Sequence, residues 1–245
     1  MTTSIAALFL SLIAFAPASL LYQGDDAFAR IRYPEAVSLY SAALNSSSDS
    51  AKVFWRLARV FICEADMSPE AARLDLYRQA EAYAVRCIEA DSMIPEGHTW
   101  RAAALGNIAM FEGGKTKIKL CYVIKRELEC SISLNGGDDI AYSILGSYYM
   151  ALGNVSWIER RLAAMFLGTL PEGGYPESEA ALRKAIAIAP TVIRHHFVLG
   201  VLYMQLDRTR EAVEDLQLVG SLPVRLASDK NRQEEAATLI AQLTQ

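Results

Sequence analysis

The feature that most constrains the fold of this chain is a repeated helical pattern. Across residues 25–245 apolar residues recur at spacings of three and four, Ala, Leu, Glu and Arg dominate, and no useful stretch alternates with period two. Two distant parts of the chain place their repeat residues at the same spacing, because Phe54 follows Ala43 by eleven positions and His196 follows Ala185 by eleven positions. A shared spacing of this kind is expected when one helical hairpin is repeated and its copies stack.

The repeated residues match the tetratricopeptide pattern. In that pattern a bulky residue, Leu-Gly and an aromatic residue on the first helix precede small, bulky and small residues on the second. Small residues are needed where two helices cross closely, and bulky residues fill the space opposite. We therefore predict close packing at these small residues: Ala36, Ala58, Ala80, Gly106, Gly146, Gly200 and Ala212.

The spacing of the repeats is irregular. The four residues in the glycine position of the first helix, at 58, 106, 146 and 200, are 48, 40 and 54 residues apart, against a nominal 34. The largest insertion lies between 146 and 200, where residues 156–168 are expected to form an extra helix. Residues 229–243 are expected to form a terminal capping helix with a polar outer face.

The sequence thus predicts an all-α, tetratricopeptide-like α-solenoid with insertions over residues 20–245. We expect four to five antiparallel helix pairs, wound as a right-handed superhelix with a concave groove.

Residues 1–19 differ from this repeat domain. An apolar run of about twelve residues, from Ile5 to Ala16, is followed by Ala16-Pro17-Ala18, a pattern typical of signal peptidase sites. The 17 residues from Ile5 to Leu21 also reach the lower limit for a membrane anchor. A signal peptide removed near Ser19, an anchor and an apolar helix packed on the repeats all stay open. The chain is accordingly expected to be exported or membrane-associated through residues 1–19, with a cytoplasmic location as the alternative.

Composition excludes several classes of function. The chain has 245 residues, is 52% hydrophobic and 21% charged, and carries a net charge of −4, so it is neither disordered nor basic like most nucleic-acid binders. The three His and four Cys show no metal-ligand spacing, and no Ser or Cys has an identifiable His and acid partner. We expect no enzyme activity, no metal, no cofactor and no nucleic-acid partner, and we expect the cysteines to be free thiols.

Several motifs resemble the regulator of microtubule dynamics family. They are Gly-His-Thr-Trp at 97–100, Glu-Gly-Gly-Lys-Thr-Lys-Ile at 112–118 and Ser-Trp-Ile-Glu-Arg-Arg-Leu-Ala-Ala at 156–164, followed by Phe-Leu-Gly-Thr-Leu-Pro at 166–171. The ending, with Pro-Val at 223–224 and Asp-Lys at 229–230, is similar too. The resemblance covers roughly 25–245. It implies a tetratricopeptide-like fold without catalytic activity that associates with microtubules and spindle poles. One branch of the family tethers organelle membranes and binds phospholipid through its repeat domain.

A cationic stretch is the first candidate binding site. Lys115, Lys117 and Lys119, with Lys125 and Arg126 behind them, form a local excess of positive charge in an acidic chain. Such a stretch suits acidic tubulin tails or lipid phosphates, whereas the alternative is a merely solvated helix face. The Gly-Gly-Lys-Thr run at 113–116 is not a phosphate loop, because Ala109 replaces the first glycine of that motif and no strand precedes it.

A second candidate cluster lies in the insertion. Arg160 and Arg161, next to Trp157, suggest recognition of a phosphate or carboxylate by an arginine fork. The alternative is structural, with Trp157 in the core and a buried pair between Glu159 and an arginine fixing the insertion.

The functional prediction is a non-catalytic adaptor that binds a protein partner in its concave groove, with tubulin or microtubules implied by the family resemblance. The alternative is a phospholipid-binding, lipid-transfer or membrane-tethering module. Its apolar groove would draw on Met110, Phe111, Met150, Met165 and Phe166, which are otherwise ordinary packing residues.

Overall fold

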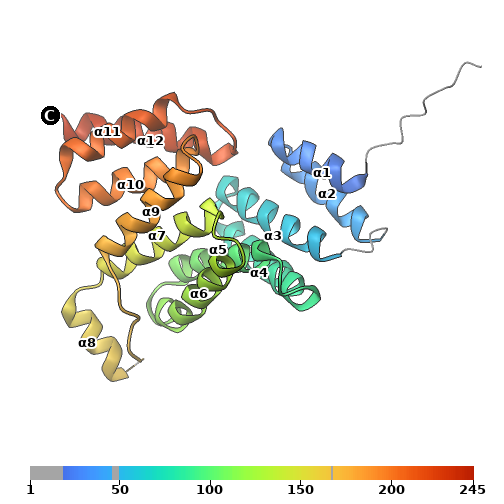
Figure 1. The fold of residues 1–245 in the computed structure, drawn as a ribbon, viewed down its shortest axis with the longest axis horizontal. Coiled ribbons are helices and arrows are strands. Elements are labelled where there is room, and N and C mark those ends of the chain that lie inside the picture. The colour runs from blue at the N-terminus through green and yellow to red at the C-terminus, as the bar shows by residue number, and fades with distance from the viewer. Residues whose placement is uncertain (1–18, 46–49, 167) are drawn as a thin grey trace, which may run out of the picture.

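Helices form all of the regular structure that the computed structural model describes, over residues 19–45, 50–166 and 168–245. The predicted N-terminal run at 5–16 lies outside these residues. The helices are α1 (Leu20–Ala29), α2 (Tyr33–Leu44), α3 (Ser50–Met67), α4 (Glu70–Ala90), α5 (Pro95–Glu112), α6 (Gly114–Leu134), α7 (Asp139–Gly153), α8 (Trp157–Phe166), α9 (Tyr175–Ile188), α10 (Ile193–Gln205), α11 (Thr209–Ser221) and α12 (Ala227–Leu243). The prediction of an all-α, tetratricopeptide-like array with insertions is confirmed (Figure 1).

The helices pack as five antiparallel pairs. They are α1 with α2, α3 with α4, α5 with α6, α7 with α9 and α10 with α11. Helix α8 is the inserted helix of the fourth pair, and α12 packs on the last pair. The first helices α3, α5, α7 and α10 contact one another in succession, and the array curves around them (Figure 1).

In these pairs a small residue on the first helix lies against the middle of the second helix. A Cβ added at Gly146 would lie 2.5 Å from Cγ of Leu182, and one added at Gly200 would lie 2.8 Å from Cγ of Leu216. The small residues in this position, all buried, are Gly24, Ala58, Ala102, Gly146 and Gly200. On the second helices, Ala36, Ala80 and Ala212 are fully buried as well.

The third pair differs from the sequence prediction. Gly106 lies one turn beyond the crossing, and a Cβ added there would meet no atom within 4 Å. The close-packed residue is Ala102, which is fully buried and shares a core cluster with Leu128 of α6. Ala102, Gly146 and Gly200 are each the eighth residue of their helix, so the position is set by distance from the helix start and not by the presence of glycine. The prediction of close packing at Gly106 is therefore wrong.

The C-terminal segment folds back onto the N-terminal half. Helix α12 contacts α3, and the backbone N–H of Ala227 donates a hydrogen bond of 3.0 Å to the hydroxyl of Tyr33 on α2. Leu226 and Ala227 also pack against the core of the first two pairs. The sequence predicts a concave groove, and in the structure this contact joins the last helix of the curve to its first pairs.

Candidate interaction surfaces

The cationic stretch forms the exposed beginning of α6. Helix α5 ends and α6 begins at Gly113 and Gly114, whose positive φ angles of 67° and 42° favour glycine. Lys115, Lys117 and Lys119 follow at once, and all three are exposed. Within the described ranges none of these three ammonium groups has a carboxylate partner. They are therefore available to an outside anion.

The two sides of α6 are not equivalent. Residues at spacings of three and four share one side of a helix, which places Lys115, Lys119, Tyr122 and Arg126 in one row, about 17 Å long at 1.5 Å per residue. Tyr122 is 53% exposed and Arg126 is exposed. Lys117 follows Lys115 by two residues, so its side chain points about 200° around the helix axis from that of Lys115. We call the four residues of the row the α6 stripe.

A shallow cavity of about 360 Å³ adjoins this stripe. It is lined by Tyr122, Val123, Lys125, Arg126 and Glu129, all from α6. Lys125 contacts Glu129 at 3.7 Å and Arg126 contacts Glu127 at 3.0 Å, so these two cations are already partly neutralised. The free positive charge is therefore greatest at the lysine end of the stripe.

Helix α8 presents an uncovered apolar side. Trp157 is 67% exposed and Met165 is 72% exposed, and Ile158 and Leu162 are more than half exposed. The guanidinium of Arg161 lies 5.7 Å from the centre of the Trp157 ring, a cation–π distance. The interpretation of Trp157 as a core aromatic is therefore wrong, because α8 projects from the array (Figure 1) and buries Ala163 in place of its large side chains.

The two arginines of α8 have separate roles. Arg160 donates to the carbonyl of Leu152 at 2.7 Å and to those of Pro171 and Gly173 at 3.4 Å, so it ties α8 to the end of α7 and to the loop before α9. Glu159 pairs with neither arginine, since its carboxylate accepts from the N–H and hydroxyl of Ser156 and begins the helix. A buried pair between Glu159 and an arginine is absent from these described residues.

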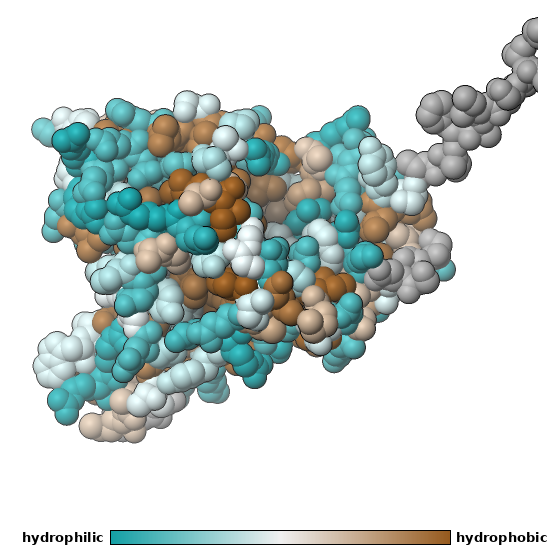
Figure 2. All heavy atoms as spheres, viewed as in Figure 1, coloured by the Kyte–Doolittle hydropathy of each residue, from teal (hydrophilic) through white to brown (hydrophobic). Residues whose placement is uncertain are grey.

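The apolar residues proposed for a lipid groove are dispersed. Met110 and Phe111 are exposed at the end of α5, Met165 is exposed on α8, and Met150 packs beside the core of the last pairs. The side chain of Phe166 lies outside the described residues. Figure 2 shows the hydrophobic residues of one face gathered near its middle, with hydrophilic residues over most of the rim.

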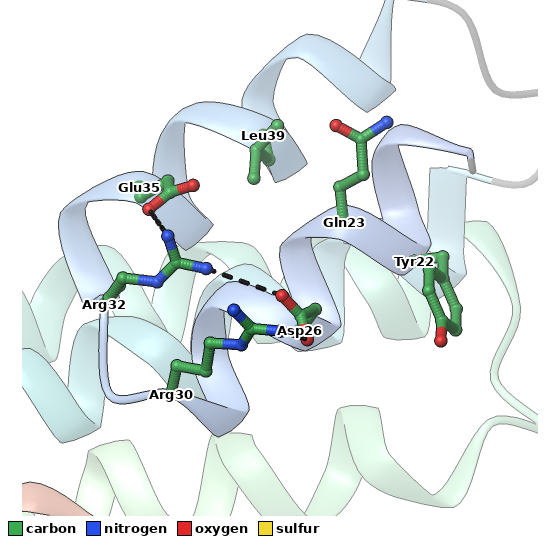
Figure 3. A pocket seen from close by; sticks show the side chains of 7 residues that line it. All are labelled: Tyr22, Gln23, Asp26, Arg30, Arg32, Glu35 and Leu39. Atoms are coloured by element: carbon green, nitrogen blue, oxygen red, sulfur yellow. Dashed lines mark hydrogen bonds and ion pairs between the residues drawn. The ribbon is translucent and has the colours of Figure 1, made fainter. Parts of the chain in front are cut away.

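A cavity of about 420 Å³ lies between α1 and α2 (Figure 3). Its charged side chains neutralise one another, because Asp26 bonds Arg30 at 3.1 Å and Arg32 at 3.5 Å, and Arg32 bonds Glu35 at 2.8 Å. The described residues hold no cluster of three or more His, Cys, Asp or Glu side chains that suits a metal ion. None of the four cysteines forms a disulfide.

Two histidines repeat one arrangement in two pairs. His98 bonds Glu127 through Nδ1 at 2.6 Å and the Ser92 carbonyl through Nε2 at 3.1 Å. His196 bonds Asp215 at 2.8 Å and the Pro190 carbonyl at 3.0 Å in the same way. A carboxylate and a carbonyl both accept, so only a positively charged ring, which donates from both nitrogens, makes both bonds at once. The thiol of Cys130 also lies 3.5 Å from Nε2 of His98.

The electrostatics of the two histidines agree with this assignment. The hydrogen bond to the carboxylate raises the pKa of His98 and of His196, against the desolvation that lowers it. Burial alone would raise the pKa of Glu127, but hydrogen bonds from His98 and Arg126 and the charge of Arg101 lower it to about 2. The sequence places His196 in a packing position but does not indicate its carboxylate partner. These histidines link the two helices of their pairs through hydrogen bonds.

Comparison with known proteins decides the family. The model of the family described as "Regulator of microtubule dynamics protein 1-3" matches residues 20–244. This chain belongs to the regulator of microtubule dynamics family. The resemblance carried by its central motifs is thereby confirmed.

Individual relatives of this family member are distant in sequence. Regulator of microtubule dynamics protein 1 of Bos taurus is 30% identical over 196 residues, covering 79% of this chain and 62% of the relative. The Pongo abelii protein 1 is 28% identical over 201 residues, covering 81% of this chain and 64% of the relative. This family member therefore spans a little less than two thirds of the length of these relatives.

Solved structures establish the fold of this family member. A tetratricopeptide repeat protein of Thermus thermophilus, TTC0263, superimposes with a TM-score of 0.66 at 18% identity, covering 89% of this chain and 97% of the other. Yeast Tom70 superimposes with a TM-score of 0.56 at 12% identity over 92% of this chain and 39% of its own. At these identities the likeness concerns fold alone. None of the helices that the structure describes is both long and apolar enough to cross a bilayer.

Proposed function

We propose that this chain is a non-catalytic adaptor that binds an acidic segment of a protein partner along the α6 stripe. The observation that carries the proposal is the run of exposed lysines at the start of α6, which have no carboxylate partner within the described ranges. The names of the relatives point to microtubules, so we propose the acidic tails of tubulin as the segment. This partner requires the chain to share a compartment with microtubules.

The geometry favours an extended acidic segment over a single anion. Cations of the stripe are spread along about 17 Å of one helix side and do not converge on one point. Tyr122, halfway along, offers an aromatic surface between the charges. A chain with several carboxylates at intervals can contact each cation in turn, whereas a lone phosphate reaches only one or two.

The test is co-sedimentation with microtubules. Lys115→Glu combined with Lys119→Glu should reduce binding at least tenfold, because each reversal replaces attraction by repulsion at a few ångströms. The matched control is Lys184→Glu combined with Lys230→Glu, which makes the same change of net charge at exposed positions on α9 and α12. Lys117→Glu should have a smaller effect, since it lies on the other side of α6. Equal losses in the stripe and control variants would reject the proposal.

A second candidate function is docking on a membrane surface, and the exposed side of α8 favours it. Trp157, Ile158, Leu162 and Met165 are uncovered, and Arg161 beside them suits anionic headgroups. Flotation with phosphatidylserine vesicles tests it, with phosphatidylcholine vesicles and microtubules assayed in parallel. Ile158→Gln with Leu162→Gln should abolish vesicle binding and leave microtubule binding intact. If wild type does not float with anionic vesicles at low salt, this candidate is rejected.

A further inference from the structure

The inner side of the array holds a site that the chain fills with its own C-terminal segment. The side chain of Asp66, near the end of α3, lies 3.9 Å from the guanidinium of Arg232 on α12. On the neighbouring helix α2, the Tyr33 hydroxyl accepts the backbone N–H of Ala227. Four residues of α12 lie between these two contacts; Ser228 and Asp229 are buried, and Lys230 and Asn231 are exposed. The start of α12 is thus seated on α2 and α3.

Helices α2 to α4 contribute an acidic side chain, Asp66, to this contact. Burial raises the pKa of the Asp66 carboxyl, whereas the opposite charges of Arg232 on α12 and Arg194 on α10 lower it. The hydroxyl of Tyr77 on α4 donates to the carboxylate at 3.5 Å. Two of these three partners come from α10 and α12, and the α2–α4 side supplies the carboxylate and the phenols of Tyr33 and Tyr77.

The bound segment has a definite chemistry. Leu226 is extended, with φ −124° and ψ 153°, and packs with Ala227 against the core of the first pairs. Asp229 accepts from the N–H groups of Arg225 and Leu226 and so fixes the first turn of α12. Arg232 then follows on the side that faces α3. The segment that occupies the site therefore consists of the extended Leu226, the capped first turn of α12 and Arg232 in its second turn.

The contact is small compared with the helix pairs that it joins. One hydrogen bond, one long ion pair and the partly buried Leu226 and Ala227 link the start of α12 to α2 and α3. By contrast, α12 is held to α11 by its own packing and by Gln233, whose amide bonds the carbonyls of Val219 and Leu222. The inner contact can therefore open while the pairs on both sides stay folded.

We propose that Asp66 and Tyr33 form a receptor for a capped helix start that carries an arginine in its second turn, that α12 occupies it in cis, and that a partner segment of the same chemistry binds by displacing α12. This receptor is independent of the α6 stripe, because its carboxylate binds a cation, whereas the stripe binds an anion. Failure of either site leaves the other intact.

The proposal is tested by competition between α12 of the same chain and an added peptide of the same sequence. The probe is a fluorescent, acetylated peptide of residues 222–245, titrated against the full chain and followed by anisotropy. In the cis occupant Arg232→Ala removes the ion pair with Asp66 and the bonds of Arg232 to Ser228 and Asp229, whereas the peptide keeps them. This variant should therefore bind the peptide about three to ten times more tightly than wild type. Arg210→Ala, which removes an exposed arginine of α11, should bind like wild type.

A receptor variant completes the experiment. Asp66→Asn added to Arg232→Ala should remove the gain in peptide affinity, since the peptide then lacks its carboxylate partner. Hydrogen exchange on the folded variants should show faster exchange in 222–232 for Arg232→Ala and Tyr33→Phe, with α10 and α11 unchanged. A peptide that binds neither wild type nor Arg232→Ala, or a gain that survives Asp66→Asn, would overturn the proposal.

Discussion

Replacing Gly146 by Ala tests the helix crossing on which the repeat depends. In most helices this change is stabilising by about 0.5–1 kcal/mol, because glycine loses more backbone freedom on folding than alanine. At Gly146 the added methyl would lie 2.5 Å from Cγ and 2.7 Å from Cδ2 of Leu182, which is fully buried. The crossing is also fixed by the Ser178 hydroxyl, which donates to the Gly146 carbonyl at 2.7 Å. Neither side can move away freely.

The two contributions oppose each other, and overpacking is the larger. Forcing a methyl into a packed core is destabilising by about 1–3 kcal/mol. Subtracting the helix preference leaves a net loss between about 0 and 2.5 kcal/mol. For a chain of this size, each kcal/mol lowers the melting midpoint by roughly 2–4 °C.

Gly106→Ala is the matched control within the same array. It is the same substitution in a first helix, but no atom lies within 4 Å of the new methyl. This variant should therefore gain about 0.5–1 kcal/mol from helix preference alone. Urea unfolding followed by circular dichroism measures both free energies of unfolding. If Gly146→Ala is as stable as Gly106→Ala, the assigned crossing is wrong.

A double mutant identifies the group responsible for the loss. Leu182→Ala alone should be strongly destabilising, by about 2–5 kcal/mol, because it leaves a cavity in the core. In the Gly146→Ala background the same truncation should be less damaging, since it also removes the clash. Additive losses would show that Leu182 is not what the new methyl meets.

Three further predictions concern other parts of the chain. The raised pKa values of His98 and His196 mean that their contribution to stability is complete below about pH 6.5 and is lost as pH rises through the raised values. Unfolding free energy should thus fall from pH 6 to 9, and His196→Gln should flatten that slope; an unchanged slope contradicts a charged His196. Arg160→Ala should speed proteolytic cleavage around α8 severalfold, whereas Arg161→Ala, whose guanidinium lies over Trp157, should not. N-terminal sequencing of natively expressed protein should begin near Ser19 if residues 1–18 are a signal peptide, and an intact Met1 refutes removal.

Much of the fold is predictable from the sequence because it rests on local patterns. The spacing of small and bulky residues on the second helices recurs at 36/40/43, 80/84/87 and 212/216/219, and each of these residues is buried. The sequence predicts an inserted helix at 156–168, and the structure has it at Trp157–Phe166, between turn residues that the sequence marks. Helical periodicity and turn chemistry operate over a few residues, so one sequence is enough to show them.

The candidate site is only partly predictable. The exposed lysines of α6 follow from their position directly after two glycines, and the structure adds Tyr122 and Arg126 to their side of the helix. The sequence favours Gly106 over Ala102 because glycine is the more conspicuous small residue, although Ala102 is the one that is fully buried at the crossing. Residue type alone assigns Trp157 to the core, whereas its exposure depends on how far α8 stands from the array.

The helix pairs follow from the sequence, because each pair is specified by contacts between neighbours in the chain. Only the folded array shows which distant residues its curve brings together. Tyr33 and Ala227 are 194 residues apart, and no local pattern indicates their hydrogen bond. Likewise, nothing in the sequence distinguishes Asp66 from other acidic residues, whereas in the structure α12 places Arg232 beside it. Such contacts depend on the sum of small rotations between successive pairs, and that sum is a property of the folded array as a whole.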